Sequence, residues 1–511
     1  MKNNVYASIE LGSFEIKILV CNIREERLFV LAQKSVPSVG IERGQITNFD
    51  KLVSQMKQLK ASVEGDLGQS LKQVMLILPT IDAVVEPVIS KINLDVKQPI
   101  TSVEVRKLLR QVMNLPHEEM QLPINVVPRL FRIDENHVVQ NPRGISGMSL
   151  SLEGSRIVMP TMVVSNLIHA TESAGFEISE IVAGSVAEAL SALNSPEMFA
   201  RSCQINLGHL MTTMTVVNDG RIIYSHTLPI GGHNVTCSIV EELQIPYDVA
   251  DKLKVDFGTY IIDGDDTGEN QIIYIDDSAD ELRYITHRML NTVITQQYDQ
   301  LFKLIRTHVS DHFRLKEDEY HYSLSGGASG LPNVLYALYA QLPYMATIHK
   351  PTMLGARCGK YTPIIGSTIF AHEITLLIGS KKDSIELDFE KKPEVKRDTV
   401  VPFSTSTLQE KPEMVTTSQP VEEQVNPLSL KDEILSQTQQ LRELANMHPS
   451  ETEVVETDKV DVQPQKEMKL FDDLAFDPMV EVESSEYMDK KLENSGMFVK
   501  LFDMIFNESE E

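Results

Sequence analysis

One short pattern that occurs twice constrains the fold of this chain more than any other feature of its sequence. The pattern is a β-rich run, a turn that contains glycine, and a second β-rich run. It predicts strands at Val5–Glu10, Glu15–Asn22, Cys203–Leu207 and Met211–Val217. Because the two copies lie roughly 200 residues apart, they predict a duplicated α/β core.

Two further glycine turns extend this pattern. Asn218-Asp219-Gly220 predicts a hairpin that leads into a strand at Arg221–Thr227, because Asp-Gly is a strong two-residue turn. Ser325-Gly326-Gly327-Ala328 lies between a strand at His321–Leu324 and a predicted helix at Leu331–Gln341, with Pro332 in the first turn of that helix. Glycine turns after strands expose backbone N–H groups that can approach an anion.

Composition divides the chain near residue 380. The 511 residues are 42% apolar, enough for a sizeable core and about three domains, but no glycine occurs between Gly379 and Gly496. This stretch is rich in Glu, Gln, Ser, Thr and Pro, so we expect residues 381–493 to form a disordered acidic linker. Apolar residues at helical spacing allow one short helix inside it, either transient or partner-binding: Leu430, Ile434, Leu441 and Leu444.

Charge and cysteine content exclude several classes of protein. Asp and Glu number 73 against 47 Lys and Arg, a formal net charge of −26, which argues against nucleic-acid binding. The four cysteines lie far apart, so we expect buried thiols in a reducing cytosol rather than disulfides or zinc. We predict no metal site at His209 and no catalytic residues, because no partners stand at suitable spacing.

A second apolar pattern lies at residues 494–507. Its apolar residues recur at helical spacing and predict an amphipathic helix. They are Met497, Phe498, Leu501, Phe502, Ile505 and Phe506. This face needs a membrane interface, a partner groove or the chain's own domain to cover it.

Four segments resemble a known family. They are SVPSVGIERGQITNFDKL (35–52), NPRGISGMSL (141–150), LPIGGHNVTCSIVEELQIPYDVADKLKVDFG (228–258) and LSGGASGLPNV (324–334). In order and spacing they are similar to the bacterial cell-division protein family FtsA, over about Val5 to Phe370. The resemblance implies an α/β, actin/Hsp70-like duplicated ATPase fold with an inserted FtsA-type subdomain, followed by a disordered tail and an amphipathic helix.

The family pattern also implies a domain division. Residues 1–81 and 163–200 would form subdomain 1A, and 82–162 an inserted, SHS2-like subdomain 1C. Residues 201–231 and 315–380 would form subdomain 2A, and 232–314 subdomain 2B. The linker 381–493 and the membrane-targeting helix 494–507 would follow.

The resemblance further implies a nucleotide site for ATP and Mg²⁺. The first phosphate turn would hold Gly12 and Ser13, with Lys17 just beyond it. The second turn would hold Gly208 and Thr212, and the glycine pair after the second hairpin is Gly231 and Gly232. An acid-lysine pair, Asp251 and Lys254, would lie along the adenosine. The adenosine-side loop would hold Gly326, Gly327 and Ala328.

The phosphate turns depart from the family pattern. Glu10 replaces Asp at the start of the first turn. In the second, Asn206 replaces a carboxylate and bulky His209 and Leu210 replace glycines. Carboxylates at such positions hold Mg²⁺ or its waters, so the site is either tolerant of these changes or weakened, and we expect at most a weak ATPase.

The implied function is a peripheral membrane protein on the cytoplasmic side of the cell membrane, at the division septum. It would anchor the FtsZ ring through residues 494–507, bind FtsZ on subdomain 2B, self-associate into filaments, contact membrane lipids and help recruit other division proteins. Two alternatives share the fold: an ATP-dependent enzyme such as a sugar kinase or chaperone, and a pilus-assembly adaptor.

Overall fold

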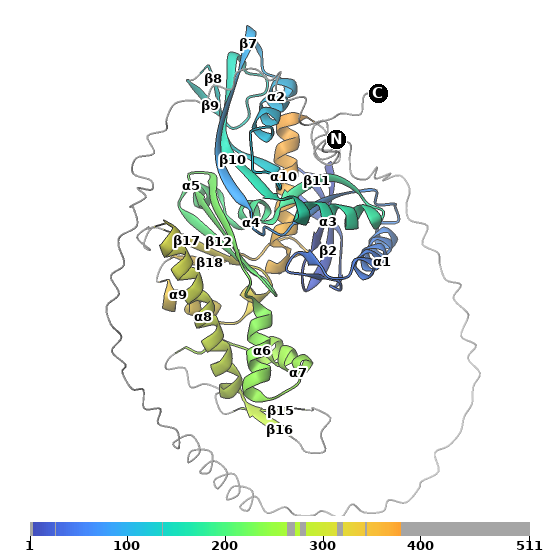
Figure 1. The fold of residues 1–511 in the computed structure, drawn as a ribbon, viewed down its shortest axis with the longest axis vertical. Helices are drawn as coiled ribbons and strands as arrows, with labels where there is room; N and C mark the ends of the chain where they lie inside the picture. Colours follow the sequence, from blue (N-terminus) through green and yellow to red (C-terminus); the bar gives the residue numbers. More distant parts are fainter. Residues whose placement is uncertain are drawn as a thin grey trace, which may run out of the picture. The chain divides into compact units, whose positions relative to one another are not determined.

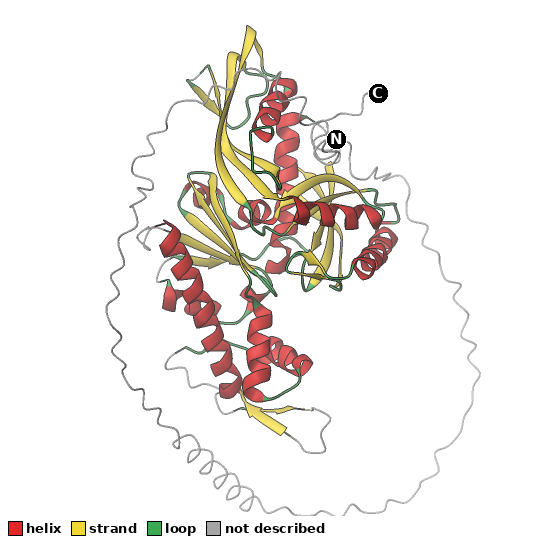
Figure 2. Ribbon diagram, in the orientation of Figure 1, coloured by secondary structure: helices red, strands yellow, loops and turns green. Residues whose placement is uncertain are grey.

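The structure is a computed structural model that describes residues 4–25, 27–134, 136–262, 271–275, 283–313, 320–342 and 345–379. The expected linker at 381–493 and helix at 494–507 lie outside the described residues. Figures 1 and 2 show two α/β lobes and a sheet that is inserted into the first lobe.

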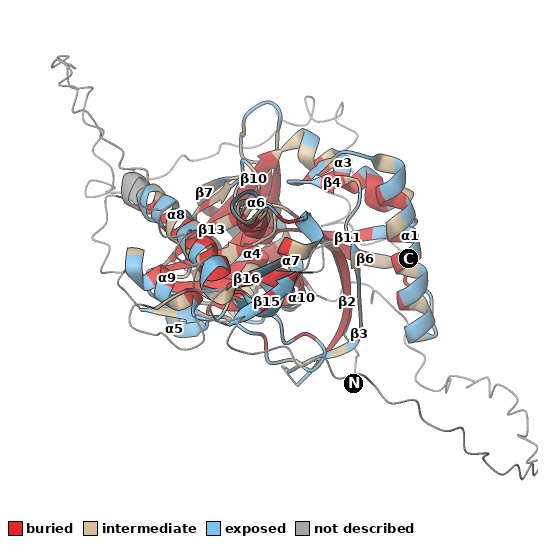
Figure 3. Ribbon diagram, turned by 90° about the horizontal axis from the view of Figure 1, so that it is seen from below, coloured by how far each residue is buried: buried red, intermediate tan, exposed pale blue. Residues whose placement is uncertain are grey.

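The first lobe is built on a five-stranded sheet of order β11-β6-β1-β2-β3. Its strands are β1 (Asn4–Leu11), β2 (Glu15–Arg24), β3 (Arg27–Pro37), β6 (Gln73–Leu78) and β11 (Glu177–Ala183). β1, β2 and β3 pair antiparallel, whereas β6 runs parallel to both β1 and β11. Residues 16–23 of β2 are all buried (Figure 3), so both faces of this strand are covered.

Helices and a small β-ribbon complete the first lobe. The helices are α1 (Phe49–Leu67), which follows the ribbon, α3 (Thr161–Ser173), which follows the inserted sheet, and α4 (Gly184–Ala192), which follows β11. The ribbon consists of β4 (Ile41–Glu42) and β5 (Gln45–Ile46).

The second lobe repeats the plan of the first. Its sheet has the order β14-β13-β12-β17-β18, with an antiparallel meander followed by parallel strands. The strands are β12 (Ser202–Leu207), β13 (Thr212–Asn218), β14 (Arg221–Leu228), β17 (His321–Ser325) and β18 (Ala346–Ile348). The duplicated core is therefore confirmed, and the predicted strands agree with the observed ones within two residues at each end.

The helices of the second lobe pack against its sheet, and helices and sheet together bury one apolar core. This part of the lobe contains α6 (Gly232–Leu243), α7 (Tyr247–Phe257), α8 (His287–Phe313) and the hairpin β15 (Ile272–Ile275) and β16 (Arg283–Thr286). The short helix α5 (Ser195–Phe199) precedes β12 and begins with a capping box at Asn194 and Glu197.

The insert is a four-stranded sheet of order β7-β10-β8-β9. Its strands are β7 (Val84–Pro99), β8 (Gln121–Ile133), β9 (His137–Val139) and β10 (Ser146–Pro160), and α2 (Ser102–Met113) packs on them. Arg156, which is 2% exposed, lies between sheet and helix, where it pairs with Glu86 and donates to the Leu115 and Pro116 carbonyls. These partners offset the cost of burying its charge.

One predicted boundary is wrong. The helix expected at Leu331–Gln341 is α9 (Val334–Gln341), which begins three residues later. Asn333 has the left-handed φ of +64°, so it separates Pro332 from the helix, and a 3₁₀ turn occupies Ala328–Gly330. Asn adopts this conformation at low cost, and no local signal marked it.

The last described helix, α10 (Thr362–Ile378), packs in the first lobe. Phe370 and Ile374 belong to the core of β1 and α4, although the expected division assigned this helix to subdomain 2A with residues 315–380. Gly359–Ile378 is long and apolar enough to cross a bilayer, but 72% of its most apolar window is buried inside the protein. It is therefore a core helix.

The C-terminal end of α10 is held by the insert. Arg143 donates to the Leu376 carbonyl over 2.9 Å, and Arg106 of α2 donates to the Ile378 carbonyl over 3.0 Å. Helix ends leave such carbonyls without partners, and cations there also complement the helix dipole. The end of α10 is thus joined to the insert by two arginines.

Candidate functional site

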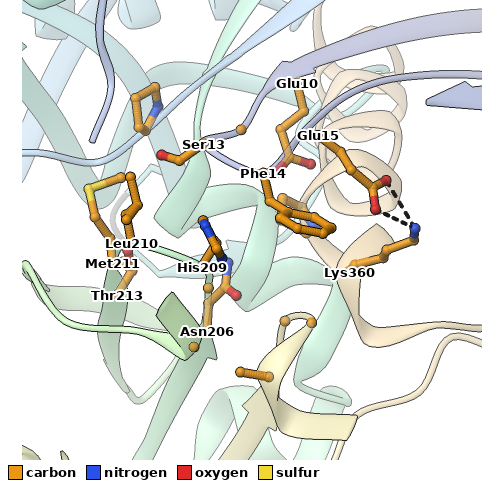
Figure 4. Close-up of a pocket in the computed structure, with 18 of the residues that line it drawn as sticks. Glu10, Ser13, Phe14, Glu15, Asn206, His209, Leu210, Met211, Thr213 and Lys360 are labelled. Carbon is orange, nitrogen blue, oxygen red and sulfur yellow. Dashed lines mark hydrogen bonds and ion pairs between the residues drawn. The ribbon is translucent and has the colours of Figure 1, made fainter. Parts of the chain in front are cut away.

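A cavity of about 480 Å³ lies where the glycine turns of the two sheets face each other. Figure 4 shows residues of both turns around it, and we call it the cleft. Ten of the twelve residues expected at a nucleotide site line it: Gly12, Ser13, Lys17, Gly208, Gly232, Asp251, Lys254, Gly326, Gly327 and Ala328.

The two phosphate turns have the same backbone geometry. In the first, Gly12 N–H donates to the Glu15 carbonyl over 3.1 Å; in the second, Gly208 N–H donates to the Met211 carbonyl over 3.0 Å. A Cβ on Gly12 or Gly208 would lie 2.8 or 2.6 Å from that oxygen. Only glycine permits this close approach.

Thr212 and Gly231, the other two expected residues, do not line the cleft but hold its second turn. Thr212 Oγ1 donates to the Ile230 carbonyl over 2.8 Å. A Cβ on Gly231 would lie 2.5 Å from the His209 carbonyl oxygen. At the N-terminus of α6, the Gly232 N–H donates a hydrogen bond to the Gly208 carbonyl of the turn. Both residues therefore position the backbone.

The third glycine loop leaves open space on the cleft side. A Cβ on Gly327 or Gly330 would meet nothing within 4 Å. The loop is supported from behind by Tyr298, whose hydroxyl donates to the Ala328 carbonyl over 2.9 Å. With Pro332 and Val255 also in the lining, this end offers the apolar and backbone surface that suits a nucleoside.

The acid-lysine pair forms a closed network. Lys254 Nζ donates to Asp251 Oδ1 and to Thr236 Oγ1, both over 2.6 Å, and Thr236 Oγ1 donates to Asp251. Burial favours the neutral form of Asp251, but the hydrogen bond and charge of Lys254 outweigh it and lower the pKa of that carboxyl. Asp251 is therefore ionised at neutral pH.

The other two lysines of the lining are also paired. Lys17 is 7% exposed. Its Nζ lies 3.0 Å from Glu10 Oε2 and donates a hydrogen bond to the Lys360 carbonyl. Lys360 Nζ lies 2.8 Å from Glu15 (Figure 4). Among the described residues that line the cleft, every lysine has a carboxylate partner, so little positive charge is left for a triphosphate.

A buried acid lies beneath the two turns. Glu188 of α4 is 5% exposed, and its Oε1 accepts a hydrogen bond from Asn206 Nδ2 over 2.5 Å. Burial raises the pKa of Glu188 to about 8; the Asn206 hydrogen bond opposes this rise, whereas the nearby Glu10 carboxylate adds to it. Glu188 is thus mostly neutral at pH 7.

Two rings meet across the cleft. Phe14 of the first turn and His209 of the second have centroids 5.0 Å apart (Figure 4), and His209 also lies 5.3 Å from the His233 ring of α6. Burial, with a smaller contribution from His233, lowers the pKa of His209 to about 4, so it is a neutral ring at pH 7. The pair occupies space between the turns, where phosphates would lie.

The sequence analysis did not single out several of these residues, among them Phe14, Glu188 and Lys360. Glu188 had a usable signal, because it is the only charged residue in the otherwise apolar or small run Gly184–Ala192. Phe14 and Lys360 had no such signal. Phe14 lies at the cleft because of the geometry of the first turn, and Lys360 because a loop distant in the sequence packs there.

The cleft fits the nucleoside better than the metal. The open glycine loop accepts a flat apolar group. For Mg²⁺, which prefers oxygen ligands of carboxylates and water, Glu10 is paired with Lys17 and Asn206 is neutral. Within the described ranges, no group of three His, Cys, Asp or Glu side chains could hold a metal ion.

Cell-division proteins are among the known proteins with similar sequences. "Cell division protein FtsA" of Bacillus subtilis is 24% identical over 392 residues, which is 74% of this chain and 86% of that protein. The protein of the same name from Streptococcus pneumoniae is 23% identical over 378 residues, 73% of this chain and 81% of that one. Among solved structures, a chain of the "PilM-PilN type IV pilus biogenesis complex" aligns with a TM-score of 0.48 at 13% identity, over 72% of this chain and 98% of that chain.

Two lobes of one strand plan, with a cleft between their glycine turns, define an actin-like ATPase fold. A family model described as "Cell division protein FtsA" matches residues 203–446, and one described as "SHS2 domain inserted in FTSA" matches residues 85–158. The chain belongs to the FtsA family of cell-division proteins. This membership favours a role in cell division over a sugar kinase, a chaperone or a pilus-assembly adaptor.

Proposed function

We propose that this chain tethers the FtsZ ring to the cytoplasmic face of the cell membrane at the division septum. Membership of the FtsA family carries the proposal, and the apolar helical pattern of residues 494–507 supports it. The amphipathic helix would insert into lipid, and the linker 381–493 would join it to the folded lobes. Six apolar residues would enter the membrane: Met497, Phe498, Leu501, Phe502, Ile505 and Phe506.

We assign partners to parts of the chain as follows. FtsZ would dock on subdomain 2B at 232–314, and the insert at 82–162 would serve self-association and the recruitment of other division proteins. Subdomains 1A (1–81 and 163–200) and 2A (201–231 and 315–380) would form the cleft walls, with α10 packed in the first. These boundaries remain proposals.

We also propose that the cleft binds ATP weakly and that the chain is at most a weak ATPase. The support is physical: the lysines that line it are paired with carboxylates, and the Phe14–His209 contact occupies the space between the turns. The nucleotide would contact Gly12, Ser13, Gly208, Gly232, Gly326, Gly327 and Ala328, with Lys17, Asp251 and Lys254 beside it and Thr212 and Gly231 behind the second turn.

A vesicle flotation assay with purified full-length protein and FtsZ tests the tether. We expect the protein to float with lipid vesicles and to carry FtsZ with it, whereas FtsZ alone stays in the dense fraction. Phe498→Glu with Phe502→Glu should abolish flotation. Asn507→Glu with Ser509→Glu adds the same two charges without touching the apolar face, so it should float normally.

Two results would contradict the tether. Flotation of the Phe498→Glu, Phe502→Glu variant would show that the helix is not the anchor. Normal flotation without co-floating FtsZ would show that the chain binds lipid but does not hold the ring.

A further inference from the structure

We propose that the cleft holds a nucleoside phosphate without a divalent metal ion, with the neutral carboxyl group of Glu188 as hydrogen-bond donor to a phosphate oxygen. This inference rests on the proposed nucleotide binding. It deepens that proposal by naming the group that takes the place of the metal.

The position of Glu188 is the first support. It lines the cleft from the middle of α4, and Asn206, its partner, lies two residues before Gly208 of the second turn. Glu10 occupies the equivalent place before Gly12 of the first turn, and its charge acts on Glu188. The carboxyl group of Glu188 therefore lies beneath the two turns that would hold phosphate.

The unused oxygen of Glu188 is the second support. Oε1 accepts the Asn206 amide, whereas Oε2 is buried and has no hydrogen-bond partner among the described residues. In the neutral acid the proton belongs on Oε2, because Oε1 acts as the acceptor. A buried hydroxyl without an acceptor is costly, and a phosphate oxygen supplies an acceptor of the right kind.

The charge balance of the cleft is the third support. A carboxylic acid brings a donor to a phosphate without adding negative charge, whereas a carboxylate would repel it. A neutral Glu188 and a neutral Asn206 are poor ligands for Mg²⁺, and Lys17 already pairs with Glu10. With the metal disfavoured, the Glu188 carboxyl group is a donor in the cleft that a phosphate oxygen can use.

Equilibrium titration of the full-length protein with a fluorescent ADP analogue tests this. At pH 7 we expect dissociation constants in EDTA and in Mg²⁺ that agree within about threefold. Between pH 7 and pH 9 the affinity should fall by about tenfold, because Glu188 ionises near pH 8. Glu188→Gln keeps a neutral donor, so it should bind within about threefold of the wild type at pH 7 and lose this pH dependence.

Control variants separate the site from general effects. Glu172→Gln, an exposed glutamate of α3, should keep the wild-type pH dependence. Asn206→Asp places a second carboxylate beside Glu188, so its affinity should become higher in Mg²⁺ than in EDTA. Thermal melting of each variant confirms that it is folded.

Three results would overturn the inference. They are a loss of more than tenfold in affinity on addition of EDTA, an unchanged pH dependence in folded Glu188→Gln, and no binding of the analogue under any condition. Flotation of the same preparations with FtsZ reports on the tether separately, so a failed nucleotide site and a failed tether give different results.

Discussion

Phe14 is 53% exposed, yet its ring lies 5.0 Å from that of His209 on the opposite side of the cleft. Nucleotide phosphates that enter between the turns must displace this contact. Aromatic contacts are worth about 0.5–1.5 kcal/mol beyond the area they bury. We therefore expect Phe14→Ala to raise affinity for a fluorescent ADP analogue by about two- to tenfold, measured by fluorescence titration.

Phe29 provides the matched control for this prediction. It is 50% exposed on β3 and does not line the cleft, so Phe29→Ala should leave the affinity unchanged. A lower affinity in Phe14→Ala would contradict the prediction, because it would mean that the ring contacts the bound nucleotide.

The buried carboxyl group of Glu188 should make the stability of the protein depend on pH. Its pKa is raised from 4.5 to about 8 in the folded protein, so between these values the folded state binds a proton that the unfolded state has released. The free energy of unfolding therefore falls as pH rises, by about 1.4 kcal/mol per pH unit from this group. The stabilisation is complete below about pH 4.5 and is lost by about pH 8.

Urea unfolding of the wild type and Glu188→Gln at pH 5.5 and 7.5 measures this effect. Relative to the variant, the wild type should lose stability over that range, because Gln does not titrate. An equal pH dependence in both proteins would show that Glu188 ionises normally.

The sequence predicted the residues of the site better than their contacts. Glycines at tight turns can be recognised from the local sequence, because a backbone carbonyl oxygen there lies too close to leave room for a Cβ. Gly12, Gly208 and Gly326 are such glycines, and all three line the cleft. Lys17 gave no such signal: its ion pair with Glu10 depends on strand register. The approach of Lys360 to Glu15 joins residues 345 positions apart, so no local pattern contains it.

At the scale of elements, the packing of α10 on α4 depends on Gly366. A Cβ there would fall on the Ala187 backbone, with the Ala187 Cα at 2.9 Å and the carbonyl closer still. Since backbone cannot move aside as a side chain can, we expect Gly366→Ala to lower the free energy of unfolding by about 3 kcal/mol or more, measured by urea denaturation.

Gly65 of α1 is the helical control for this substitution. A Cβ at Gly65 would meet nothing within 4 Å, so Gly65→Ala should stabilise the protein by about 0.5–1 kcal/mol through helix propensity alone. Equal effects of the two substitutions would contradict the proposed helix contact.

The hairpins were predictable because their signals are local. Asp219 and Gly220 both have the positive φ that a two-residue hairpin turn requires, and the sequence shows this directly. The start of α9 was not predictable from the sequence. The left-handed conformation of Asn333 is imposed by the loop in which it lies, and asparagine alone does not mark a helix boundary. The place of α10 in the first lobe is a tertiary property that an apolar run does not reveal.

At the scale of the whole molecule, charge predicts how the proposed lipid binding would respond to salt. The chain carries a formal net charge of −26, and the segment 494–507 has only Lys500 as a cation. Aromatic insertion rather than attraction to anionic lipid should therefore drive binding. We expect vesicle flotation of the full chain to change by less than about twofold between 0.1 and 0.5 M NaCl. A loss at moderate salt would show that binding is electrostatic.

The two arginines at the end of α10 have a mechanical consequence. Arg106 and Arg143 join the last turn of this helix to the insert, and its body is packed in the first lobe. A pulling force that enters through the chain after Gly379 would act on the first lobe and the insert together. The second lobe would bear that load only through its contacts with them, so tension from the proposed membrane anchor would not have to open the cleft.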